Sequence, residues 1–481
     1  MKKKFFSNLL FLLFLNLLIK PFYIFGIDRT VQNLVGAEDY GIYYALFNFS
    51  FLLNILLDLG ISQFNNRNIS QNQQLASKNF PGIFTLRIVL AFVYIIVTVS
   101  VALAVGYKLY ELKFLGLLML NQVFIAFILF FRSNIAGLHF FRTDSIISVL
   151  DRLLMIAFCG YLLLHPVYKT EFKIEWFIIL QSISYLITAV IAFILLLNHT
   201  RFILKLKWKP VFYLSILKQS FPFALLILLM AMYFSIDKVM VERLLPNGAE
   251  QAGIYAQAYR ILDALIIIGF LFSNLLFPIF SKMIKNKEPV MEIVRLSNSL
   301  LLVPTFIISI FAIVYSYQII GALYFEHIEQ ASQIFRLLMF SFIPICSIYI
   351  YGTLLTANGD MKFLIITAAV ALFINITFNF ILIPEFQANG AAIAVLATQG
   401  TAAIIQYVAA NKKFKDDQKS GFFIIFLFLI FSVLVMIGSY YLPFAWITNA
   451  TLGLLSCFLL SFGMKMLNPL ALFGILKEEK Y

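Results

Sequence analysis

Long apolar runs alternate with short polar segments along almost the whole chain. Most runs hold about twenty residues, the length that a helix needs to cross the hydrocarbon core of a bilayer. A membrane β-barrel would instead show alternating segments of about ten residues. The pattern predicts fourteen membrane-spanning helices, near residues 8–27, 41–61, 82–106, 112–131, 145–164, 175–197, 215–236, 252–278, 296–316, 333–355, 362–383, 388–410, 420–441 and 446–467.

Composition agrees with a polytopic membrane protein, because 62% of the residues are hydrophobic and only 12% are charged. The net charge of +13 raises the question of a nucleic-acid partner. Cytoplasmic loops of membrane proteins collect Lys and Arg, which is the better explanation. With fourteen spans, 24 of the 36 Lys and Arg residues lie on one side and 7 on the other. We therefore expect both termini in the cytoplasm. The three cysteines and four histidines show no metal-binding spacing, so no metal site is expected.

A short motif occurs twice in the same direction. "GAEDYGIYY" at residues 36–44 returns as "GAEQAGIYA" at residues 248–256, with six of nine residues identical. The copies follow the first and the seventh predicted span, which predicts a parallel repeat of six helices. The expected fold class is all-α, with two six-helix lobes and two additional C-terminal helices. We expect lobes at 1–197 and 215–411, a basic cytoplasmic linker at 198–214, and the two helices with a cytoplasmic tail at 412–481.

Charges deep in the predicted spans are mostly positive. Lys20, Arg152 and Arg260 stand against Asp151 and Asp263. A charge at the bilayer centre costs about 2.5–3.5 kcal/mol on insertion scales and usually faces a cavity or a partner. Two related bundles favour a transporter, and a basic cavity favours an anionic guest such as a lipid-linked diphosphate. Arg260 and Asp263 lie three residues apart, so a purely structural ion pair is the alternative for them.

Two further groups of polar residues lie within the apolar runs. Asp58, Arg87 and Arg336 are near predicted helix ends. There, a side chain that extends its charge to the membrane surface (snorkelling) is as good an explanation as a role inside the protein. Asn375 and Asn379 share one face of the eleventh span. Their amides either join two helices or coordinate a small cation.

The ordered set of motifs resembles bacterial polysaccharide-export flippases of the multidrug/oligosaccharidyl-lipid/polysaccharide (MOP) superfamily, which includes the Wzx-type O-antigen flippases. The similar pieces are Gly26, Arg29, "VGAEDYGIYY", "DLGI", Arg67, "SIDKVMVERLL", "GIYAQAYRI" and "IPEFQANGAAIAV". The resemblance implies a V-shaped pair of lobes around a cationic cavity in the bacterial inner membrane. It implies that undecaprenyl-diphosphate-linked O-antigen, capsule or exopolysaccharide units are flipped to the outer leaflet by alternating access. The chain is then not an enzyme.

Related lipid II flippases carry a sodium site, and this resemblance implies coupling-ion roles for Asp237, Asn375 and Asn379. An amide at position 379 replaces the acid of those relatives. The family's basic cluster in the first helix corresponds to Arg29 and to Lys20. We expect Na⁺ or H⁺ coupling, no other cofactor, and a monomer. The expected partners are the lipid-linked oligosaccharide, membrane lipids, a polysaccharide polymerase and a chain-length regulator, but no nucleic acid.

Three other functions compete with this one. A lipid II flippase or a multidrug exporter would belong to the same superfamily, and the exporter would prefer cationic guests. A membrane glycosyltransferase would need an acid in an early outer loop, where Glu38 and Asp39 are present. Glu38 recurs as Glu250 in the second copy, which favours a structural role, and no large outer loop is predicted.

Overall fold

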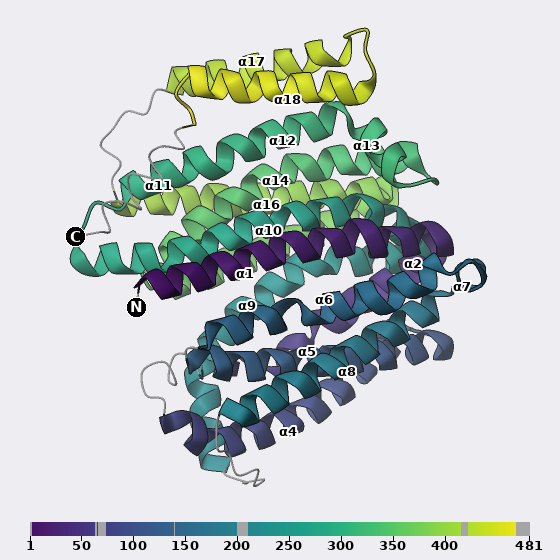
Figure 1. Ribbon diagram of the computed structural model, residues 1–481, viewed down its shortest axis with the longest axis vertical. Coiled ribbons are helices and arrows are strands. Elements are labelled where there is room, and N and C mark those ends of the chain that lie inside the picture. Colours follow the sequence, from purple (N-terminus) through teal and green to yellow (C-terminus); the bar gives the residue numbers. More distant parts are fainter. Residues whose placement is uncertain are drawn as a thin grey trace. The chain divides into compact units, whose positions relative to one another are not determined.

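The computed structural model describes residues 2–62, 65, 74–138, 140–199, 210–414 and 422–467, and within these ranges it is helical without strands (Figure 1). Eleven of the helices in the described ranges are long and apolar enough to cross a membrane. The predicted spans near 8–27, 41–61 and 420–441 fall on further helices at those places. The prediction of an all-α polytopic membrane protein is confirmed. Arg67, residues 200–209 of the predicted linker and residues 468–481 of the predicted tail lie outside the described residues.

The chain forms two compact units, Met1–Gly253 and Ile254–Tyr481. The predicted lobe boundaries at 197 and 215 stay a prediction. In the first unit, α5 packs against α8, α1 against α6, and α2 against α9. Its elements are α1 (Lys2–Phe22), the π-helical turn η1 (Tyr23–Asp28), α2 (Arg29–Leu52), the 3₁₀ turn η2 (Asn54–Leu57), α4 (Gln74–Val105), α5 (Leu109–Gly137), α6 (Phe141–Leu164), α7 (Pro166–Thr170), α8 (Ile174–His199), α9 (Pro210–Leu244) and the start of α10 (Gly248–Asn286).

Aromatic side chains fill the core between α4, α5 and α8. Phe80 of α4 is 1% exposed and stacks on Phe130 of α5 with ring centroids 5.3 Å apart. Phe131 meets Phe193 of α8 at 5.2 Å. Such large rings bury much apolar area in specific geometry, so these helices form a stable frame for the polar residues of the first unit.

A kink, and not a loop, separates the first two predicted spans. The helix runs through α1, η1 and α2, and only Gly36 leaves helical geometry, with φ 83° and ψ 171°. Glycine adopts this backbone without the penalty that a Cβ brings. Within this helix the Tyr40 hydroxyl donates to Asp28 at 2.9 Å.

The "DLGI" segment ends this helix through a buried ion pair. Asp58 accepts hydrogen bonds from the Ser62 amide at 3.1 Å and the Ser62 hydroxyl at 2.7 Å, and it pairs with Arg87. Leu59 and Gly60 have positive φ, which turns the chain. Arg87 is 2% exposed and lies over the Phe130 ring. Snorkelling is therefore the wrong explanation for Asp58 and Arg87.

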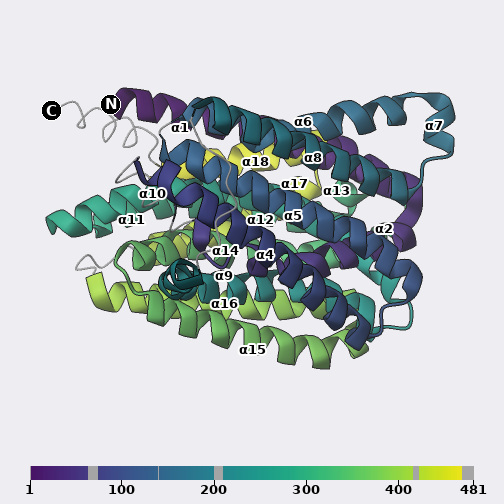
Figure 2. The same cartoon turned by 90° about the horizontal axis from the view of Figure 1, so that it is seen from below.

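The second unit is organised around α14. This helix packs against α12 and α16, and α15 packs on α16 (Figure 2). Helices α17 and α18 form a hairpin beside α12 (Figure 1), where Phe428, Met436 and Cys457 are buried. Its further elements are α11 (Met291–Ser297), the π-helical turn η3 (Asn298–Leu302), α12 (Val303–Val314), α13 (Ser316–Leu323), α14 (Ile328–Ala357), α15 (Met361–Phe386), α16 (Ala388–Phe414), α17 (Phe422–Tyr440) and α18 (Trp446–Gly463).

Candidate functional site

Two of the predicted cations of the first unit lie near each other. Lys20 ends α1 next to Pro21, and its charged neighbours are Arg152, Asp151 and Arg132. The Arg152 guanidinium lies 4.6 Å from the centroid of the Tyr23 ring, and its Nε lies 3.5 Å from the Asp151 carboxylate. Arg152 thus lies next to one carboxylate and against the face of one aromatic ring. Lys20 adds a second positive charge to the same region.

Arg29 is a third cation, placed where the π-helical turn passes into α2. Its Nε is buried, and within the described part of the chain its guanidinium has no hydrogen bond and no ion pair. The neighbouring Asp28 is 2% exposed and is held by Tyr40. The rest of the Arg29 guanidinium is partly exposed and has no hydrogen bond to the described residues, which leaves it available to hold an anion.

A chain of aromatic and amide groups surrounds these charges. Asn121 of α5 donates to Gln181 of α8 at 3.3 Å, and Gln181 donates to the Tyr43 hydroxyl at 3.3 Å. Tyr185 of α8 offers Arg152 a second ring at 5.8 Å. Amides and phenols can donate and accept, so they orient charges without neutralising them.

Sequence reasoning missed Asp28 and its partner Tyr40 as parts of this interior. The two motif copies differ at three places, and at two of them Tyr40 and Tyr44 correspond to Ala252 and Ala256. The first copy therefore carries two phenol groups that the second lacks at these positions. The hydrogen bond to Asp28, twelve residues away, needed the observed helix geometry.

Arg260 and Asp263 lie on α10 in the second unit. Nη1 of Arg260 is 3.8 Å from Oδ2 of Asp263, a loose ion pair, and both residues make further interactions. Their side chains are 17% and 37% exposed, so neither is sealed in a core. The predicted role of Arg260 in a cavity stays a prediction.

The coupling-ion candidates lie in different units. Asp237 on α9 is fully buried beside Lys238, whose Nζ lies 3.5 Å away. In the second unit, Asn379 donates to Asn375 at 2.9 Å, and Asn375 donates to Thr398 of α16 at 3.3 Å. These bonds join α15 to α16, as the helix-packing alternative expects.

One carbonyl oxygen of the Asn375–Asn379 pair accepts no hydrogen bond in the described part of the chain. Oδ1 of Asn379 is buried and accepts no hydrogen bond from the described residues. A single carbonyl oxygen is a minor part of the six or more oxygens that a hard divalent cation takes. Across the described residues, no group of three or more His, Cys, Asp or Glu residues could hold a metal ion.

The two copies of the repeated motif contact each other in a reciprocal way. A Cβ on Gly41 would lie 1.8 Å from the carbonyl oxygen of Ala249, and a Cβ on Gly253 would lie 1.8 Å from that of Ala37. Gly41 corresponds to Gly253 and Ala37 to Ala249, so the contact repeats itself with the copies exchanged. Gln32 adds a hydrogen bond of 2.8 Å to the Gly253 carbonyl. Only glycine allows this approach of two backbones.

Beside this crossing, an ion cluster joins the end of α9 to the start of α5. Arg243 pairs with Glu111 at 3.1 Å and with Glu242 at 2.6 Å, and its guanidinium lies 3.5 Å from the centroid of the Tyr107 ring. The Tyr107 hydroxyl donates to Glu242 at 3.5 Å. Burial, and then the Glu242 charge, raises the pKa of the Tyr107 phenol well above its usual value, so the hydroxyl keeps its proton.

Solved structures with this fold are transporters. Lipid II flippase MurJ in an inward closed conformation is 15% identical, with a TM-score of 0.69 over 91% of this chain and 96% of that one. An inward-facing multidrug resistance MATE family transporter of the MOP superfamily is 12% identical, with a TM-score of 0.60 over 85% and 99%. A MOP superfamily transporter from Pyrococcus furiosus is 13% identical, with a TM-score of 0.59 over 85% and 95%.

No curated protein matches the sequence. The family model described as "Polysaccharide biosynthesis protein" matches residues 7–284, which is more than half of the chain and includes both copies of the motif. The resemblance that the motifs suggested is thereby confirmed. The chain is a multi-pass membrane protein that belongs to the polysaccharide biosynthesis protein family, and it shares its fold with transporters of the MOP superfamily.

Proposed function

We propose that the protein flips undecaprenyl-diphosphate-linked oligosaccharide from the cytoplasmic to the outer leaflet of the bacterial inner membrane. The observation that carries this proposal is the excess of positive charge inside the first unit. Arg29 has no ion pair among the described residues, and Lys20 adds its charge to that of Arg152. A diphosphate is an anion that guanidinium groups bind in a bidentate way.

Alternating access requires one end of the protein to close while the other is open. The reciprocal contact of Gly41 and Gly253, together with the Arg243–Glu111 pair, supports such a closure. Both contacts join the predicted first lobe to α9 and the start of α10, which we assign to the second lobe. By the predicted threading they lie at the outer end, so we infer that they part when the oligosaccharide leaves.

The experiment compares Arg29→Gln with a matched control in cells that lack the native gene. Lys285→Gln is the control, because Lys285 is exposed and remote in sequence from the cations of the first unit. We expect Arg29→Gln to lower surface polysaccharide about tenfold or more while lipid-linked oligosaccharide accumulates on the inner face. A loss of that size corresponds to about 1.4 kcal/mol of transition-state binding. The control should export normally.

Two outcomes would contradict the proposal. Normal export by Arg29→Gln at normal abundance would remove the anion role of this residue. The second outcome is that this protein restores growth to cells depleted of their lipid II flippase but does not restore polysaccharide export. Lipid II would then be the substrate. The fold similarity to lipid II flippase MurJ is the reason for including that arm.

A further inference from the structure

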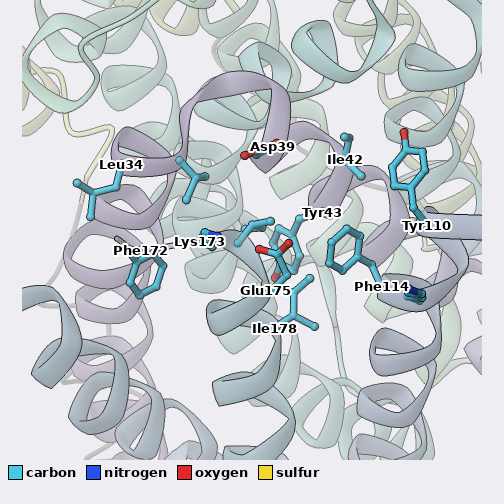
Figure 3. A pocket seen from close by; sticks show the side chains of 13 residues that line it. Leu34, Asp39, Ile42, Tyr43, Tyr110, Phe114, Phe172, Lys173, Glu175 and Ile178 are labelled. Atoms are coloured by element: carbon cyan, nitrogen blue, oxygen red, sulfur yellow. The ribbon is translucent and has the colours of Figure 1, made fainter. Parts of the chain in front are cut away.

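A cavity lies in the first unit and is lined in part by Tyr43, which is also a neighbour of Arg152. It has a volume of about 680 Å³ and lies between the middle of α2, the start of α5, and the start of α8 with the two residues before it (Figure 3). This size is in the range of small-molecule sites. Tyr43 and Glu175 lie at its centre, Asp39 is on one side, and Phe172 and Phe114 flank it.

Four charged side chains line this cavity, and none is engaged elsewhere in the described part of the chain. They are Asp39, Lys113, Lys173 and Glu175. Glu175 is half-buried and the others are exposed. The nearby Glu111, in contrast, forms an ion pair with Arg243. Four unpaired charges that surround one cavity leave their hydrogen-bonding capacity free for a guest.

The equal numbers of carboxylates and ammonium groups indicate which class of ligand this cavity can bind. Two carboxylates disfavour a phosphate, two ammonium groups disfavour a cation, and an apolar guest would offer the half-buried Glu175 carboxylate no hydrogen bond. A hydroxyl group both donates and accepts, so a ligand rich in hydroxyls can serve carboxylates and ammonium groups together.

The aromatic lining fits the same guest. Tyr43, Tyr110, Phe114 and Phe172 come from α2, α5 and the start of α8. Tyr110 and Phe114 present accessible rings that can pack on the C–H faces of a pyranose while the ring edges stay available to polar partners. Tyr43 and Phe172 are only 2% and 7% exposed and belong to the floor of the cavity. Tyr43 is fixed from behind by Gln181 and by the Phe177 ring at 5.3 Å, so part of the cavity floor is rigid before a ligand arrives.

We propose that this cavity, here called the outer pocket, binds the glycan of the lipid-linked oligosaccharide after it has reached the outer leaflet. The proposal rests on the proposed function, which supplies the glycan, and on the predicted threading, which puts Lys113 and Lys173 in outer loops. The pocket is a site for the product glycan, and the cations that we assign to the diphosphate do not line it.

The test uses the full chain in lipid nanodiscs and the oligosaccharide that mild acid releases from polyprenyl diphosphate lipids of the native cells. Binding is followed by saturation-transfer NMR, with glycerophosphoethanolamine as a second probe. The pocket variant is Asp39→Asn with Glu175→Gln, and the control is Lys169→Gln with Glu171→Gln. These control residues are exposed on the same corner but do not line the cavity.

We expect the wild type and the control to bind the oligosaccharide and the pocket variant to lose at least tenfold in affinity. Unchanged affinity in the pocket variant, or no binding to the wild type, would overturn the inference. Displacement of the oligosaccharide by glycerophosphoethanolamine at lower concentration would also overturn it, because the occupant would then be a phospholipid headgroup. Flipping by the wild-type protein is measured in parallel, so a failed proposed function is distinguished from a failed pocket.

Discussion

Single glycines decide how closely the two copies of the motif approach. Gly41→Ala places a methyl group where the Ala249 carbonyl oxygen lies, and the helices must separate. Overpacking of this kind costs about 1–3 kcal/mol. We expect lower export at unchanged abundance, and weaker cross-linking between cysteines introduced at positions 37 and 249.

Gly116→Ala is the matched control for this prediction. Gly116 also lies in a helix of the first unit, but a Cβ there meets nothing within 4 Å. Equal loss of export in both variants would show that the crossing of the motif copies does not matter for transport.

Arg260 allows a second test at the scale of residues. We expect Arg260→Ala to abolish export in protein of normal abundance, and Arg260→Lys to restore it partly, because a point charge replaces a bidentate fork. Surface export and membrane abundance are measured together. Half-exposed pairs are worth little, about 0–1 kcal/mol, so loss of the bond to Asp263 alone predicts a small effect. Recovery of export in Arg260→Ala with Asp263→Ala would assign both residues a structural role.

At the scale of helices, the ion pair of Asp58 and Arg87 ends the first long helix and anchors it to α4. Asp58→Ala leaves a guanidinium that is 2% exposed without its carboxylate, which costs about 3–5 kcal/mol. We expect a clear fall in the thermal unfolding temperature of the purified protein. The double variant Asp58→Ala with Arg87→Leu should recover part of it. A double variant less stable than Asp58→Ala would contradict this account.

Two of the predicted coupling-ion residues lie on α15, where they join it to α16. We propose that Asn375 and Asn379 act with Asp237 in binding Na⁺ or H⁺. Asp237→Asn should lower transport in reconstituted vesicles and remove its dependence on one of the two gradients. Normal transport by this variant, with each gradient collapsed in turn, would leave Asn375 and Asn379 as packing residues. Their bonds to each other and to Thr398 already account for that role.

Hydropathy predicted the helices because burial in lipid acts on every residue of a span. It could not predict the kink at Gly36, since Asp28 and Tyr40 satisfy each other across twelve residues. The snorkelling explanation of Arg87 was wrong for the same reason, because its partners are remote in sequence. The cations Lys20 and Arg152 could be listed from sequence as deep charges, and the helices α1 and α6 bring them near each other. The outer pocket was not predicted, because its residues come from three separate parts of the chain that only the fold brings together.

For the whole molecule, the fourteen-span threading places both termini in the cytoplasm. Reporter fusions at Lys480 and in the linker at 198–214 should both read cytoplasmic. A cysteine in place of Lys173 should react with a membrane-impermeant maleimide from the outer side, since the three native cysteines are buried. A periplasmic reading at either fusion, or protection of the new cysteine in intact cells, would contradict the threading.

The crossing of Gly41 and Gly253 also bears on speed. Side chains that are ordered at an interface lose up to about 2 kcal/mol of rotamer entropy each, whereas glycine and alanine lose none. A contact made by Gly41, Gly253, Ala37 and Ala249 therefore forms and breaks without reordering the side chains at its centre. The glycine crossing itself therefore loses little side-chain entropy when these helix ends meet, and the ordering of Gln32 and of the Arg243–Glu111 pair beside it sets the entropic cost of closing this end.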